Sequence, residues 1–63
     1  MARYVFEQDE VRAHPLHGDL IVLDTERTDH DRTLVMTTNE RRGTESWYAV
    51  QLARFPVVEA APV

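Results

Sequence analysis

The chain has 63 residues and no cysteine, and its eleven carboxylates against seven basic residues give a formal net charge of -4. A chain of this length forms one small domain at most, and such a domain buries only about 60% of the surface that its unfolded state exposes. Without cysteine, neither a disulfide framework nor a thiolate zinc site can add stability. We therefore expect oligomerisation or a tightly packed barrel to compensate for the small core.

Charge and hydropathy also exclude several classes of protein. The negative net charge disfavours generic attraction to phosphate backbones. The longest uninterrupted apolar run, residues 20–23, is far shorter than the roughly 18 residues of a membrane span, and Arg3 interrupts any apolar signal core. All seven basic residues are arginine, so the lysine of a phosphate-binding P-loop is missing. We expect a soluble, cytoplasmic protein that contacts no membrane and needs no cofactor.

The first third of the chain predicts one strand and one reversal. Within residues 3–7, Tyr4 and Phe6 alternate with charged or smaller neighbours, which is the period of a strand. Residues 8–13 are polar, and either a loop or a single helical turn fits them. Pro15 and Gly18 then favour a chain reversal over residues 14–19.

Two further strands are predicted in the middle of the chain. Residues 19–24 form an apolar, β-branched run between two aspartates, which indicates a central strand covered on both faces. The wholly polar residues 25–32 indicate a solvated loop or a splayed hairpin end. Threonine, valine and leucine within residues 33–38 are typical of a half-buried strand.

The next segment reads NERRGTESWY and predicts a hairpin. Residues 39–45 are a short polar connection containing Gly43, and they lead into a β-prone run at 46–51. A helical turn at 52–55 and a closing strand at 56–59 would follow, with proline at the permitted first position. An alternative is a helix over 46–55 that starts with Ser46 as N-cap and ends before the proline. The domain would span residues 2–59, followed by a frayed tail at 60–63.

Three short matches resemble the SH3-like fold. Gly18-Asp19-Leu20-Ile21 resembles the opening of its second strand, Trp47-Tyr48 its aromatic pair, and Phe55-Pro56 the step before its last strand. The resemblance implies a mostly β, single-domain, SH3-like barrel of four to five antiparallel strands, a fold often used for binding. Val57 and Val58 follow where the groove tyrosine of signalling SH3 domains would stand, so binding of proline-rich peptides is not implied.

Catalytic and metal-binding constellations are weak. His14, His17 and Asp19, with His30 more distant, contain ligand types that suit zinc, but exposed histidines in a turn explain the same pattern. Ser46 could join a histidine and an aspartate in a hydrolase triad, yet no nucleophile-elbow sequence surrounds it. We predict no metal site and no enzymatic activity.

The candidate binding residues are Arg41, Arg42, Trp47 and Tyr48. Arginine, tryptophan and tyrosine dominate binding hot spots because they combine large contact area with directed hydrogen bonds. The alternative is structural: Trp47 in the core and solvated arginines at a hairpin tip. Alternation along a strand places Trp47 and Tyr48 on opposite faces. A second candidate is an acidic surface, which would consist of Asp9, Glu10, Glu26, Asp29 and Asp31.

These features favour a non-enzymatic, accessory or regulatory module that binds a protein partner through the 39–48 hairpin or the acidic loops. One alternative is sequence-tolerant nucleic-acid binding, with arginines on phosphate and an aromatic ring on a base, although the net charge opposes it. Another is a structural homo-oligomer in which the apolar residues 20–23 and 34–36 pair between subunits.

Overall fold

The computed structural model describes residues 1–61. Their elements are β1 (Tyr4–Phe6), β2 (Val11–His14), β3 (Gly18–Val22), β4 (Glu26–Thr28), β5 (Leu34–Asn39), β6 (Gly43–Tyr48), α1 (Ala49–Leu52) and β7 (Val57–Glu59). The Cα radius of gyration is 10.7 Å, close to the roughly 11 Å expected of a compact domain this long. Residues 60 and 61 form no regular element, and residues 62–63 lie outside the described part, so the frayed tail at 60–63 stays a prediction.

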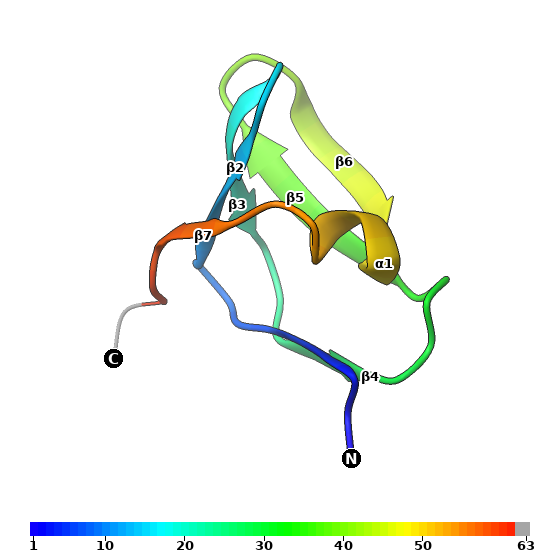
Figure 1. Ribbon diagram of the computed structural model, residues 1–63. Coiled ribbons are helices and arrows are strands. Elements are labelled where there is room, and N and C mark those ends of the chain that lie inside the picture. Colours follow the sequence, from blue (N-terminus) through cyan, green and yellow to red (C-terminus); the bar gives the residue numbers. More distant parts are fainter. Residues whose placement is uncertain (62–63) are drawn as a thin grey trace.

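The strands form two antiparallel sheets (Figure 1). The larger sheet has the order β6-β5-β3-β2-β7, and β1 pairs with β4 in a separate two-stranded sheet. The prediction of a mostly β fold with antiparallel strands is therefore confirmed. The prediction of a barrel of four to five strands is wrong: residues 1–61 contain seven strands, and the sheets do not close because β6 and β7 lie at opposite edges of the larger sheet.

Alternation along β1 and β3 supplies much of the core. Phe6 is buried while its neighbour Val5 is 44% exposed, as the period of two predicts. In β3, Leu20 and Val22 are buried, but Ile21 between them is 39% exposed. The strand is central, as expected, but the expectation that both of its faces are covered is wrong. The buried apolar side chains are Phe6, Leu20, Val22, Val35, Ala49 and Leu52, with Tyr4, Trp47 and Phe55 packed against them.

Two strands lie in polar segments for which the sequence predicted none. β2 begins inside the supposed loop or helical turn at 8–13, and it pairs with β3 on one side and β7 on the other. β4 lies within residues 25–32 and pairs its backbone with β1, where Phe6 stands opposite Glu26. Side chains of a two-stranded ribbon can stay hydrated, so a strand of this kind needs no apolar pattern.

The segment 46–55 begins as a strand and ends in one helical turn. β6 continues to Tyr48, and α1 covers only Ala49–Leu52, so the alternative of a helix over 46–55 is wrong. The predicted strand and turn are both present, but the turn begins at Ala49 rather than Leu52. Ala49 and Leu52 are fully buried, and a spacing of three residues places both on the core side of one helical turn.

The buried side chain of Arg12 forms an ion pair beside β2 and also joins β2 to α1. The Nη2 atom of Arg12 lies 3.3 Å from Glu10 Oε2, and both side chains are almost completely buried. The Nη1 atom of Arg12 donates to the Phe55 carbonyl at 3.0 Å and to the Leu52 carbonyl at 3.4 Å. The guanidinium also lies 4.9 Å from the centre of the Phe6 ring. One side chain thus connects a strand, a core ring and the last turn of the helix.

We predict that Arg12→Ala will lower the free energy of unfolding by about 3–5 kcal/mol, because it leaves the Glu10 carboxylate buried without its partner. Such a loss would unfold much of a domain whose total stability lies near the lower end of about 5–15 kcal/mol. Urea unfolding followed by circular dichroism at one protein concentration measures the change. The control is Arg32→Ala, since Arg32 is exposed and forms no ion pair in residues 1–61. A loss below about 1 kcal/mol for Arg12→Ala would contradict the assigned role.

Candidate functional site

The tip of the β5–β6 hairpin presents both predicted arginines to solvent. The Oδ1 atom of Asn39 accepts the Arg42 backbone N–H at 2.7 Å, and Gly43 takes a φ of +69° that favours glycine. The Arg42 side chain donates to Glu45 at 2.7 Å. This bond raises the pKa of Arg42 and lowers the pKa of Glu45. Arg42 is therefore paired within its own hairpin, whereas the exposed Arg41 has no ion pair within the described residues.

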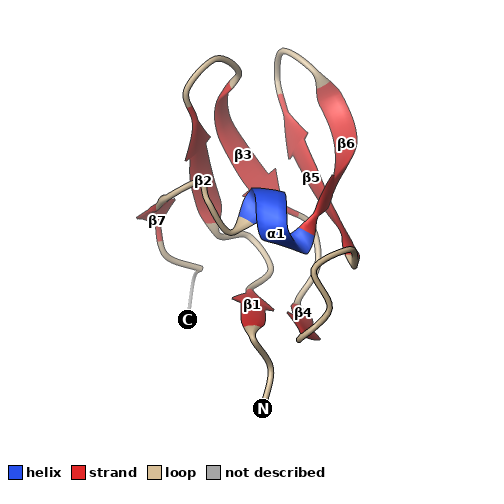
Figure 2. Ribbon diagram, turned by 45° about the vertical axis from the view of Figure 1, so that its right-hand side comes forward, coloured by secondary structure: helices blue, strands red, loops and turns tan. Residues whose placement is uncertain are grey.

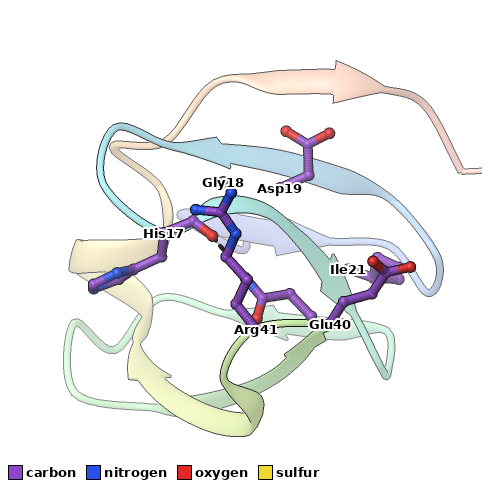
Figure 3. A pocket seen from close by; sticks show the side chains of 7 residues that line it. His17, Gly18, Asp19, Ile21, Glu40 and Arg41 are labelled. Carbon is purple, nitrogen blue, oxygen red and sulfur yellow. Dashed lines mark hydrogen bonds between the residues drawn. The ribbon is translucent and has the colours of Figure 1, made fainter.

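A hollow separates this tip from the β2–β3 hairpin. Asn39 bridges the two hairpins by donating from Nδ2 to the His17 carbonyl at 2.9 Å. The hollow has a volume of about 370 Å³, and Figure 3 shows Arg41 extending across it toward Gly18. Its lining residues are His17, Gly18, Asp19, Ile21, Asn39, Glu40 and Arg41. Asp19 and Glu40 together outweigh the single positive charge of Arg41, so the lining does not favour an anionic ligand.

The neighbours Trp47 and Tyr48 lie on opposite faces of the hairpin, as the alternation predicts. Trp47 is half-buried and packs against the core, and its Nε1 donates to the Thr37 hydroxyl at 2.9 Å. Tyr48 is 44% exposed and stands opposite Leu34 in the β5–β6 register. Of the two aromatic candidates, only Tyr48 presents its ring for contact with a partner.

Four rings close the side of the molecule that strand pairing leaves open; we call His14, His17, Trp47 and Phe55 the aromatic seam. The His14 ring stacks on His17 with centroids 4.1 Å apart, and it lies 5.5 Å from Trp47 and 4.7 Å from Phe55. The seam thus joins β2 and its turn to β6 and to the chain after α1. The sequence analysis did not group these residues, although all four occur in segments noted there for other reasons.

Two backbone hydrogen bonds hold the His14 ring in the seam. Its Nδ1 atom accepts the backbone N–H groups of Leu16 and His17 at 3.0 and 3.1 Å. Beside the seam lies a second hollow of about 500 Å³, lined by Ala13, His14, Pro15, Arg54, Phe55 and Pro56. Neither hollow holds a nucleophile beside a base.

The outer face of the larger sheet carries an apolar strip, defined here by Ile21, Leu34, Met36 and Tyr48. Their side chains are 39%, 58%, 47% and 44% exposed, respectively. Leu34 pairs with Tyr48 and Met36 with Ser46, so these residues adjoin across β5 and β6. The apolar runs at 20–23 and 34–36 therefore divide between core and surface. Their backbones cannot pair between subunits, because β3 and β5 are interior strands.

The predicted acidic surface is only partly a surface. Glu10 was expected there, which is wrong, since it is 5% exposed and pairs with Arg12. Asp31 binds Arg3 at 3.0 Å and accepts a hydrogen bond from the Tyr4 hydroxyl, which raises the pKa of Tyr4. Glu26 is half-buried, whereas Asp9 and Asp29 are exposed. Of these five carboxylates, Asp9 and Asp29 are therefore the ones that remain exposed without an ion pair in residues 1–61.

The candidate metal and catalytic residues do not assemble. His14 and His17 adjoin, but His30 lies in another loop, where its Nδ1 accepts the Arg32 N–H. Among residues 1–61, no group of three or more histidine or carboxylate side chains could hold a metal ion. Ser46 is exposed opposite Met36 on the outer face, while the histidine pair lies in the seam. Within residues 1–61, no helix has the length and apolar character needed to span a membrane.

Comparison with known proteins adds no relative: the chain matches no family model, no curated protein and no solved structure. The functional argument therefore depends on the residues themselves.

We predict that the aromatic seam makes the fold sensitive to mild acid. Loss of hydration lowers the pKa of His17, and Arg42 and His14 lower it further. The unfolded chain therefore takes up this proton near pH 6.5, before the folded chain does. The resulting stability is fully present above about pH 6.5 and is lost as the pH falls through the folded pKa.

Urea unfolding midpoints at about pH 7.5 and pH 5.5 test this prediction. The wild type should lose stability at the lower pH, and His17→Gln should lose clearly less. His30→Gln is the matched control, because His30 stacks on none of the rings described in residues 1–61, and it should retain the wild-type response. An undiminished loss in His17→Gln would show that another group is responsible.

Proposed function

We propose that this protein is a non-enzymatic interaction module, accessory or regulatory in role, that binds a protein partner through its β5–β6 hairpin. The observation that carries the proposal is the apolar strip, in which large side chains adjoin on an open sheet face with Leu34 58% and Met36 47% exposed. Contiguous exposed apolar groups on a small domain mark interaction sites. Arg41 and the Arg42–Glu45 pair provide polar groups at the hairpin tip, in keeping with the polar rim of protein interfaces.

We also propose that the fold of this chain is similar to the SH3-like fold. A five-stranded antiparallel sheet with a helical turn before its last strand supports it. Small domains of this kind commonly serve as binding modules, which is an argument by analogy. A cytoplasmic location likewise stays a prediction from the sequence, as does the lack of enzymatic activity. The separation of Ser46 from the histidine pair supports the latter.

Nucleic-acid binding has weaker support. An exposed Tyr48 ring, and Arg41 with no ion pair to any of residues 1–61, would suit a base and a phosphate. However, Trp47 is occupied in the seam, Arg42 is bound by Glu45, and the net charge is -4. Of the four hairpin residues that this function would use, only Arg41 and Tyr48 therefore remain available.

The test is an affinity capture from nuclease-treated and untreated lysate of the native host. We expect the wild type to retain a discrete protein in both lysates, and Met36→Lys to reduce its recovery about tenfold or more, because it buries a charge at an apolar contact. The Arg41→Ala/Arg42→Ala double variant should reduce recovery less.

Val5→Lys is the matched control, since Val5 has a similar exposure of 44% but lies in the other sheet. It should capture as the wild type does. Equal recovery with Met36→Lys would exclude the outer face, and recovery that nuclease abolishes would favour nucleic acid. Each variant is first checked for folding by circular dichroism.

A further inference from the structure

The two edges of the larger sheet differ in how they are protected. The β7 edge has three residues, follows Pro56, and has an irregular register with β2. The β6 edge has six residues and contains neither proline nor lysine. Figures 1 and 2 both show β6 at the outer side of the sheet, with no ribbon beyond it. Proteins usually block an edge of this length, because its free backbone groups pair readily with another strand.

The ladder shows which backbone groups of β6 face outward. The Ala49 N–H donates to the Thr33 carbonyl at 2.8 Å, which continues the β5–β6 register by one pair. Because hydrogen-bonded and non-bonded pairs alternate in an antiparallel ladder, Trp47 and Glu45 bond to β5. The N–H and C=O groups of Thr44, Ser46 and Tyr48 therefore point away from the sheet. The Tyr48 N–H fits this orientation, since it donates to the Gln51 side chain at 3.2 Å rather than to β5.

We propose that β6 pairs with β6 of a second copy of this chain, antiparallel, with the two-fold axis at Ser46. In this register the two Ser46 residues exchange N–H to C=O bonds, and each Thr44 N–H reaches the partner's Tyr48 carbonyl. A register centred on Glu45 would use the same free groups but would place the two Glu45 side chains directly opposite one another. Like charges in that position are destabilising. The register at Ser46 instead places Glu45 opposite the partner's Trp47.

Several features favour a second copy over a strand of another protein. Two-fold pairing occupies the β6 edges of both larger sheets and leaves these sheets only their protected β7 edges, so pairing through the larger sheets stops at two subunits. The hairpin segment 39–48 contains Glu40, Arg41, Arg42 and Glu45, so its charges balance and the net charge of -4 lies elsewhere. A chain this short also gains more from burying surface in a dimer than a larger domain would.

The dimer would place the two apolar strips side by side on one continuous face. This inference goes beyond the proposed function, because it concerns the edge of β6 rather than its outer face. A monomer whose outer face still captures a partner would overturn the dimer alone. A dimer in which Met36→Lys captures normally would overturn the proposed function alone.

Position 46 provides a decisive test, because each Ser46 faces its own copy across the axis. We expect sedimentation velocity to show a dimer for the wild type and a monomer for Ser46→Glu and for Ser46→Lys. The like charges and distorted pairing should raise the dissociation constant about tenfold to a hundredfold. An affinity-tagged Ser46→Lys chain should then capture untagged Ser46→Glu, but not untagged Ser46→Lys.

Thr44→Glu is the matched control on the same strand and face, since it stands opposite the partner's Tyr48 and creates no like-charge pair. It should weaken the dimer less than Ser46→Glu. Hydrogen exchange on the wild type adds a measurement that needs no variant: the Thr44 and Ser46 amides should exchange more slowly as protein concentration rises. A wild type that stays monomeric at about millimolar concentration, or charge variants that dimerise as the wild type does, would overturn the proposal.

Discussion

The buried guanidinium of Arg12 is the constraint on which the rest of the structure depends. A charge removed from water must find partners of matching geometry, and Arg12 finds them in Glu10 and in the carbonyls of Leu52 and Phe55. The Leu52 carbonyl lies at the end of α1, where backbone acceptors have no partner within the helix, and the Phe55 carbonyl lies in the chain that follows. The chain after β6 must therefore turn at once and bring this end over β2. That turn also positions Phe55 for the aromatic seam.

The seam substitutes for the strand pairing that a closed barrel would have. With α1 leading the chain away from β6, the last strand joins β2 at the far edge of the sheet (Figure 2). Stacked rings then span the open side, with His14 in contact with both Trp47 and Phe55. Ring stacking holds the hairpins together but provides no hydrogen-bond partners for the outward-facing backbone groups of β6. The same geometry that completes the core thus leaves one edge of the sheet exposed.

The sequence predicted the elements whose side chains alternate and missed those governed by pairing. The strand at Tyr4–Phe6, the central strand and the 39–48 hairpin follow from apolar period and turn residues. β2 was missed because Arg12 reads as a surface residue, and its burial is explained by long-range and local contacts with Glu10 and with the Leu52 and Phe55 carbonyls. β4 was missed because its side chains are all polar, so the pairing of its backbone with β1 leaves no apolar pattern in the sequence. For the candidate site, strand alternation correctly placed Trp47 and Tyr48 on opposite faces. No local rule, however, could predict that Arg42 rather than Arg41 pairs with Glu45.

The hairpin's residues divide into those that already have structural partners and those that remain available. Trp47 is bound to Thr37 and to the seam, and Arg42 is bound to Glu45, so removing either would test stability as much as binding. Tyr48 and the rest of the apolar strip have only part of their surface covered. A hot-spot residue must be free in the monomer and buried in the complex. By that criterion the proposed interaction surface shifts from the arginine tip to the outer face and edge of the same hairpin.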